Sequence, residues 1–478
     1  MPPGRLLGFE NNDMTEIDLD TLSLRAAHAA LRDRRLTATA LAAHAAERHA
    51  AHDYQAYITW SGEQALTAAA HIDALLAAGY DSGPLMGLPV SVKDLFAVPN
   101  LPTYAGSAAR LPAEWERPGP VMSSALAQLA LVMGKTHTVE FAFGGLGTNA
   151  HWGTPRNPWD PNEHRVPGGS SSGAGVSLVE GSALLAFGTD TAGSVRIPAA
   201  MTGTTALKTT AGRWPKAGIV PLSSTLDTPG ILANTVDDLA FAFDAIDARL
   251  NPALDRTAQP LDISDLRLGV PETFFWEDCS PGVAEAVQSA IDTLARRGAR
   301  IVKLELPRCQ EAYEMFRNGG VAASELAAFL RRQLPDHIAK LDPNVAQRIA
   351  AADALSAWEY VDRRALLESF VETATEALAG VHALLTPTVA VTPPTLGSLE
   401  PDGAYAKANM LALRNTMIGN FMGLAGLTLP VGKDAAGMPV GLQLLGAPWS
   451  ESQLLAAGCA VERVLGTRYD ILGRPASA

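Results

Sequence analysis

Apolar positions recur at helical spacing near the start of the chain and at strand-like spacing after it. Within about residues 22–78, Ala and Leu return every three or four positions, which predicts two or three amphipathic helices. The next run, "LMGLPVSVKDLFAV", is short, β-branched and bounded by glycine and proline, so it predicts a buried strand. From there to about residue 244, short apolar strands alternate with helical stretches and Gly-rich turns, which is the pattern of an α/β fold.

The second half of the chain repeats this alternation around a long helical stretch. "LRLGVP" (266–271) and "ARIVKLELP" (299–307) predict strands around a helix at about 282–297. Residues 309–378 are strongly helical, short strands return in "VHALLTPTVAVTPP" and "GLTLPVG", and a final helix begins near Ser450. Pro and Gly are spread evenly and no repeat or low-complexity linker occurs. We therefore predict an N-terminal extension over 1–20 and one large α/β domain over 21–478, with a helical segment at about 308–380.

Composition narrows the class of protein. The chain has 478 residues, 47% of them hydrophobic, enough for a large core. Its formal charge of −13 disfavours a general nucleic-acid binder. The three cysteines are far apart, which argues against a disulfide framework or a zinc site and for a reducing, cytoplasmic location. No stretch has the length of a membrane-spanning helix or of the apolar core of a signal peptide.

The stretch "VPGGSSSGAG" (166–175) is the first candidate for chemistry. Structured apolar sequence lies close on both sides, so a flexible linker is the weaker interpretation. A Walker phosphate loop would need a lysine after Gly173, where this chain has Ala174. A dinucleotide fingerprint would follow a strand directly, whereas a proline-rich loop precedes this stretch. A helix N-terminus holding an anion is a further alternative, and catalysis is the interpretation that the following residues favour.

A second Gly/Ser turn follows within reach of the first. Residues 171–179 predict a short helix and "ALLAF" (183–187) a strand, and these return the chain toward its starting loop. The chain arrives at "GTDTAGSVRIP", where Ser194 lies at the tip of the turn and successive N–H groups can hold an oxyanion. Ser170 and Ser194 are therefore predicted to meet, although 24 positions separate them.

A serine nucleophile needs a base, and two kinds of residue compete for that role. The nearest histidines, His137, His151 and His164, carry no motif that ties them to Ser194. Lys93 interrupts the apolar strand "PVSVKDL", and the alternation of side chains along a strand turns Asp94 away from it. Burial without a carboxylate lowers the pKa of a lysine, so Lys93 can act as a base near neutral pH. A Lys93 that extends to solvent is the alternative.

Taken in order, these segments resemble the amidase signature family over most of the chain. The resemblance is carried by "GLPVSVKDLFAVPNLPTYAGS", "GKTHTVEFAFGGLGTNAHWGTPRNPWDP", "PGGSSSGAGVSLVEGSALLAFGTDTAGSVRIPAAMTGTTALKTTAGRWPKAGIVPLSSTLDTPG", "ALLTPTVAVTPP" and "GLTLPVGKDAAGMPVGLQLLGAP". It implies a single domain with a central mixed, twisted β-sheet flanked by helices, and a signature core at about residues 80–245. It also implies hydrolysis of amide C–N bonds without a metal or cofactor.

The resemblance also implies a role for each site residue. Ser194 would be the nucleophile, Ser170 a bridging serine after a cis peptide bond, and Lys93 the base of a Ser–cisSer–Lys triad. The implied oxyanion donors are the N–H groups of Thr191, Ala192, Gly193 and Ser194. The implied supporting side chains are those of Ser171, Thr189, Asp190 and Arg196. The implied substrate loop consists of Ala142, Phe143, Gly144, Gly145 and Leu146.

The chain departs from the family pattern in two places. Ala192 precedes Gly193 where the family often has two glycines, which adds one methyl group to the floor of the site. Lys208 lies in "ALKTT", where the family often has "GLKPT", and is a second lysine near the site. Ser172 receives no role.

The substrate cannot be derived from these residues. The implied activity is that of a free-standing amidohydrolase acting on a small amide, carbamate, aryl amide or ester, as a monomer or homodimer without nucleic-acid or membrane partners. The alternative within the family is the A component, the glutaminase, of a glutamyl-tRNA amidotransferase. A binding protein on an inactive scaffold is disfavoured, because all three triad residue types are present.

Overall fold

The computed structural model describes residues 17–254 and 259–475, and its centre is a single eleven-stranded sheet. Its strands lie in the order β1-β3-β2-β4-β6-β5-β10-β11-β9-β7-β8. Their bounds are β1 Tyr57–Trp60, β2 Pro89–Lys93, β3 Leu131–Thr136, β4 Leu185–Asp190, β5 Thr205–Lys208, β6 Thr228–Ala233, β7 Arg267–Val270, β8 Arg300–Lys303, β9 Ala383–Pro387, β10 Ala425–Lys433 and β11 Pro439–Gly446.

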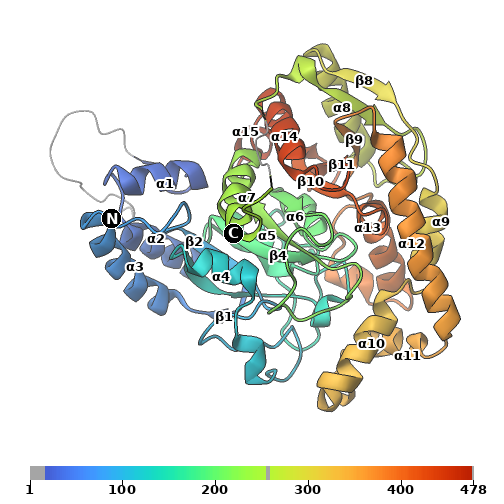
Figure 1. The fold of residues 1–478 in the computed structure, drawn as a ribbon, viewed down its shortest axis with the longest axis horizontal. Coiled ribbons are helices and arrows are strands. Elements are labelled where there is room, and N and C mark those ends of the chain that lie inside the picture. The colour runs from blue at the N-terminus through green and yellow to red at the C-terminus, as the bar shows by residue number, and fades with distance from the viewer. Residues whose placement is uncertain (1–16, 255–258, 476–478) are drawn as a thin grey trace.

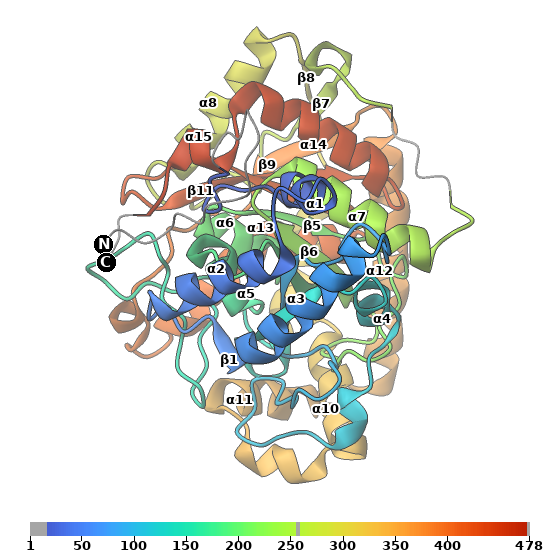
Figure 2. The same ribbon diagram turned by 90° about the vertical axis from the view of Figure 1, so that its left-hand side faces the viewer.

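Helices cover both faces of this sheet. Figure 1 shows α1 to α3 at one end of the molecule and α9 and α12 at the other, and Figure 2 shows α1, α2, α3 and α5 on the near side. The helices are α1 Leu24–Arg32, α2 Ala38–Ala50, α3 Gly62–Ala77, α4 Pro120–Leu126, α5 Ser172–Glu180, α6 Arg196–Thr202, α7 Val236–Leu250, α8 Val283–Arg296, α9 Cys309–Arg317, α10 Ala322–Gln333, α11 Pro343–Ala352, α12 Ala357–Leu378, α13 Ala404–Phe421, α14 Glu451–Leu465 and α15 Arg468–Leu472.

The apolar runs of the sequence become strands because both faces of the sheet are covered. Every residue of β2, β4, β5, β6, β9 and β11 is buried, as expected for strands that read as continuous apolar runs. β2 lies parallel to both β3 and β4, whereas β4 and β6 are antiparallel, so the sheet is mixed. The largest apolar cluster joins these strands to α1, α7, α8 and α14.

The fold class predicted from the sequence, a mixed sheet flanked by helices, is confirmed. The predicted strand in "LMGLPVSVKDLFAV" is β2, the helix at 282–297 is α8, and the stretch 309–378 forms α9 to α12. The prediction missed β1, a four-residue edge strand between two Ala-rich helices. Most of the predicted extension, residues 1–16, lies outside the described residues. No helix within the described ranges is both long and apolar enough to span a membrane.

Candidate active site

The candidate residues gather where two parallel strands end side by side. Lys93 is the last residue of β2 and Asp190 the last of β4, and these strands pair directly. Since parallel strands end at the same edge of a sheet, the "PVSVK" run and the "GTDTAGS" turn meet there. The helix α5 starts at this edge too, directly after Ser170 and Ser171. The two Gly/Ser turns of the sequence therefore come together.

Lys93 is fully buried and makes no ion pair among the described residues. Its Nζ is hydrogen-bonded to Ser170 Oγ at 2.7 Å and to Thr189 Oγ1 at 2.8 Å. Asp94 points the other way and pairs with Lys135, with 3.0 Å between Oδ1 and Nζ. Burial lowers the pKa of Lys93 to about 7, although the charges of Asp227 and Asp190 act to raise it. The structure thus favours a base over a lysine that extends to solvent.

Ser170 and Ser194 belong to loops that touch through their backbones. The Gly169–Ser170 peptide bond is cis, as the resemblance implied. The Ser171 N–H donates to the Ser194 carbonyl at 3.2 Å, which holds the two turns against each other. No hydrogen bond joins the two side-chain hydroxyls, and Ser194 Oγ has no hydrogen-bond partner among the described residues. A hydrogen bond therefore joins Lys93 to Ser170, whereas none joins the Ser170 hydroxyl to the Ser194 hydroxyl.

The turn before Ser194 requires glycine. Gly193 has φ +134°, and a Cβ there would lie 2.0 Å from Thr416 Oγ1 of α13. Its N–H, predicted as an oxyanion donor, instead donates to Asp190 Oδ1 at 2.7 Å. The physical reason is that the carboxylate lies inside the turn and accepts from both Gly193 and Val195. This arrangement leaves the N–H groups of Thr191, Ala192 and Ser194 as candidate donors.

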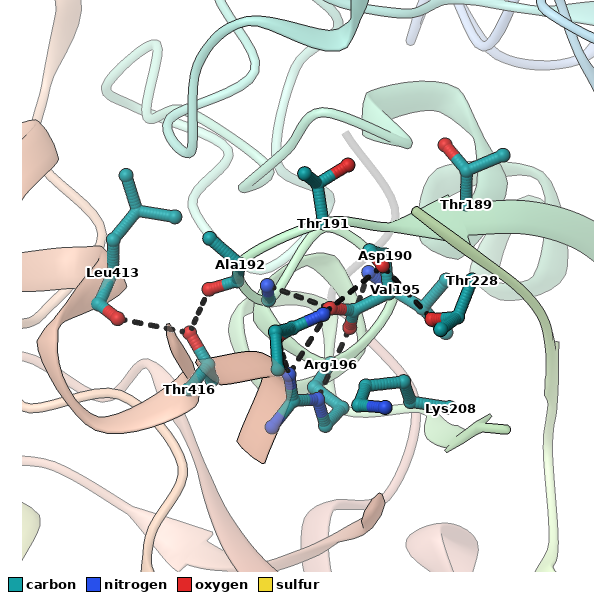
Figure 3. Close-up of polar contacts among 12 residues, drawn as sticks. Thr189, Asp190, Thr191, Ala192, Val195, Arg196, Lys208, Thr228, Leu413 and Thr416 are labelled. Carbon is teal, nitrogen blue, oxygen red and sulfur yellow. Dashed lines mark hydrogen bonds and ion pairs between the residues drawn. The ribbon is translucent and has the colours of Figure 1, made fainter. Parts of the chain in front are cut away.

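Asp190 holds this turn through a buried ion pair. Arg196 donates to both carboxylate oxygens, each at 3.0 Å, and both side chains are fully buried (Figure 3). Gln443 and Asn420 accept from the remaining guanidinium N–H groups, each at 2.7 Å. The pKa of Asp190 falls to about 2, since the Arg196 charge and hydrogen bonds outweigh the effect of burial. A fixed carboxylate beneath the turn fixes the direction of its remaining N–H groups.

The predicted substrate loop, residues 142–146, is mostly packed. Leu146 is fully buried in a cluster with Val166 and Ile197, and Ala142 is also buried, so neither presents its side chain to an open site. Phe143 is half-buried, with the Arg348 guanidinium 5.1 Å from its ring centroid. Of the predicted apolar contacts, Phe143 alone is partly exposed.

A cavity of about 690 Å³ adjoins the base. Thr189 and Asp227 form its wall nearest Lys93, and Glu325, Phe329 and Tyr360 form the wall contributed by α10 and α12. Two helices of the helical segment thus line a cavity that adjoins Thr189, and the expectation that this segment shapes the substrate pocket stays a prediction.

Two polar supports of the turn were not predicted from the sequence. Asp227 Oδ1 accepts from Thr191 Oγ1 at 2.6 Å, and its Oδ2 accepts from the backbone N–H of Leu222 and Ser223. Thr416 Oγ1 donates to the Ala192 carbonyl at 2.7 Å (Figure 3). Asp227 lies in the segment "STLDTPG", where an acidic residue among small ones is a usable signal. Thr416 is one of many buried residues of α13, more than 200 positions from the turn, and carries no local signal.

The competing bases are placed elsewhere. His151 Nε2 lies 3.2 Å from Glu140 Oε1, and His164 Nε2 lies 3.0 Å from the Thr154 carbonyl. Burial lowers the pKa of His137 to about 4, and its Nδ1 has no partner among the described residues. Burial likewise lowers the pKa of Lys208 to about 7, but its Nζ donates to the Thr209 carbonyl. A lowered lysine pKa therefore does not distinguish the two lysines, whereas contact with Ser170 does.

Replacing Asp227 with asparagine is expected to reduce kcat about tenfold or more with little change in KM. The amide keeps the shape but weakens the acceptors that hold Thr191 and the 222–223 backbone. It also removes a negative charge that raises the pKa of Lys93, so the acidic limb of kcat/KM should move to lower pH. Steady-state kinetics from pH 5 to 9 measures both effects. The exposed Asp402→Asn variant is the control, and an unmoved limb would contradict the assignment.

Comparison with known proteins yields one consistent family. A family model described as "Amidase" matches residues 38–455. The 2-amino-5-chloromuconic acid deaminase of Comamonas testosteroni is 54% identical, over 95% of this chain and 98% of that protein. The A component of the glutamyl-tRNA(Gln) amidotransferase of Koribacter versatilis is 32% identical, over 94% and 99%. A solved structure described as an amidase superposes with TM-score 0.84 at 31% identity, covering 93% of this chain and 100% of that one.

Proposed function

The chain belongs to the amidase family and is a hydrolase that cleaves C–N bonds; from this premise we propose that its substrate is a small unsaturated amino dicarboxylic acid of the 2-aminomuconate type. The observation that carries this proposal is the 54% identity, over nearly the full length of both chains, with the Comamonas testosteroni deaminase. The net reaction replaces the amino group with an oxygen from water and releases ammonia.

The proposed mechanism uses the residues at the strand ends as a proton relay. Neutral Lys93 accepts a proton from Ser170 as Ser170 accepts one from Ser194, and Ser194 Oγ attacks the carbon that carries the nitrogen. For a conjugated 2-amino acid, that carbon is electrophilic in the imine tautomer. The attack moves the electron pair of the C=N bond onto nitrogen, and the N–H groups of the turn hold the substrate carboxylate next to the reacting carbon. The relay returns this one proton to the nitrogen, a carbon of the substrate chain gives up the second proton as its double bonds re-form, ammonia leaves, and water releases the product from Ser194.

The alternative, the glutaminase component of a glutamyl-tRNA amidotransferase, has less support. Relatives with that name match at 31–36% identity, well below the deaminase. The proposal also includes a cytoplasmic location, which the three free cysteines support. The prediction of a monomer or homodimer remains untested.

Ammonia release from a panel of substrates tests the proposal. We expect kcat/KM for 2-aminomuconate or its 5-chloro derivative to exceed that for glutamine, benzamide and an acyl anilide by about 10² or more. Loss of the diene absorbance should accompany ammonia in a one-to-one ratio. Glutamine hydrolysis that needs a partner protein would favour the alternative, and preference for a simple amide would leave the family assignment intact but overturn the substrate.

A further inference from the structure

A second cavity, of about 310 Å³, lies at the opposite edge of the sheet from Ser194. It is bounded by α2, by the end of α5 at Glu180, by the residues that lead into β2 and β4, and by α15. α5 begins beside the triad and ends at this cavity, and its nine residues span roughly 13 Å. The two cavities share no lining residue. The second cavity is therefore separate from the site described above.

The wall of this cavity contains a buried guanidinium with an unused donor. Arg468 is only 2% exposed. Its Nε donates to the Gly203 carbonyl at 2.9 Å and its Nη1 to Asn234 Oδ1 at 3.0 Å. Its Nη2 is buried and has no hydrogen-bond partner within the described ranges. Arginine is rarely buried without a carboxylate, because an uncompensated buried charge costs several kcal/mol.

The neighbouring charges do not neutralise Arg468. Arg48 and Arg474 also line the cavity, so three arginines contribute to its wall. The carboxylate of Asp20 contacts both Arg474 and Arg48. Its Oδ2 accepts a hydrogen bond from Arg474 at 2.9 Å, and its Oδ1 lies 3.7 Å from Arg48 Nε. Glu180 is held on its other side by His49 at 2.8 Å and Ser182 at 3.0 Å. No described carboxylate forms an ion pair with Arg468.

We propose that this cavity binds a small oxyanion, a phosphate or a small carboxylate, with Arg468 Nη2 as its central donor and Arg48 at its rim. An oxyanion would satisfy the free N–H and supply the missing negative charge, whereas a water molecule would do only the first. Burial of Arg468 lowers its pKa, although Tyr469, whose ring centroid lies 4.9 Å from the guanidinium carbon, acts to raise it.

Anion binding to the full-length protein tests this site. Inorganic phosphate, malonate and chloride are compared at constant ionic strength by calorimetry and by the shift in Tm. We expect saturable binding of phosphate or malonate but not of chloride, and the comparison identifies which oxyanion is preferred. Arg468→Gln should weaken binding at least tenfold, while the exposed Arg331→Gln should not. Ser194→Ala should bind as the wild type does, which separates this site from the catalytic one.

A structural measurement keeps the proposal testable if Arg468→Gln does not fold. Wild-type crystals soaked in selenate should show an anomalous peak within hydrogen-bond distance of Arg468 Nη2. Absence of saturable binding by both oxyanions, equal binding by Arg468→Gln, or a peak only at other positions would each overturn the inference.

Discussion

Replacing Ser194 with alanine is expected to reduce kcat/KM by roughly 10⁴-fold or more, because no other described hydroxyl can take its place at the turn. The substitution removes only Oγ, which makes no hydrogen bond to a described residue. The backbone contacts of the turn remain, since the Ser194 carbonyl still accepts from Ser171 and Asp190 still accepts from Gly193 and Val195. The loss should therefore appear in catalysis and not in folding.

Covalent labelling distinguishes a lost nucleophile from a disturbed site. A fluorophosphonate probe should modify the wild-type protein once, at Ser194, and should leave Ser194→Ala unlabelled. Ser172→Ala is the matched control from the start of α5, because Ser172 Oγ only reaches the Ser170 carbonyl, at 3.5 Å. This control should keep both activity and labelling. Labelling of a different serine, with Ser194 unmodified, would refute the assignment.

The parts of the site that the sequence predicted are those encoded locally. The run "PVSVK" is mostly apolar before its one lysine, so it could be read as a buried strand ending in a buried amine. The turns at 168–171 and 190–194 carry glycine where the backbone needs it, as at Gly193. The length of α5 and β4 between them then predicted that the turns meet. Each of these inferences depends on neighbours within about 25 residues.

The parts that the sequence did not predict depend on distant partners. The Gly193 N–H was expected to face a substrate, but Asp190 folds back beneath the turn because Arg196 and Asn420 hold its carboxylate there. Asn420 comes from α13, where buried polar residues are mixed with apolar ones and show no amphipathic pattern. Leu146 was expected to belong to the substrate loop, yet it packs against α6 through Ile197. Such contacts between remote segments leave no local pattern.

The two buried lysines also show that the sequence does not reveal which distant groups a side chain contacts. Lys93 and Lys208 are both fully buried, and burial lowers the pKa of each to about 7. Their difference is one of contact, because Lys93 meets the Ser170 and Thr189 hydroxyls whereas Lys208 meets the Thr209 carbonyl. The resemblance to the family selected Lys93, and the geometry supports that choice.

Replacing Lys93 with methionine is expected to lower kcat/KM about 10³-fold and to remove the acidic limb of its pH profile. The wild-type limb should lie near pH 7, since only the neutral amine accepts a proton from Ser170 and the pKa of Lys93 is about 7. A histidine base would give a different limb: His137, with a pKa near 4, would place it well below 7. Lys208→Met is the matched control and should keep the limb.

The same substitution should raise Tm, which separates loss of the base from loss of the fold. The unfolded chain holds the Lys93 proton up to a pKa of about 10.4, whereas the native protein releases it near 7. Lys93 therefore lowers the free energy of unfolding, fully below pH 7 and less and less as the pH rises from 7 to 10.4. Lys93→Met should thus exceed the wild type in Tm at pH 6 to 8, with the difference shrinking toward pH 10. An inactive variant with a lower Tm at every pH, or an active one that retains the limb, would show that another group is the base.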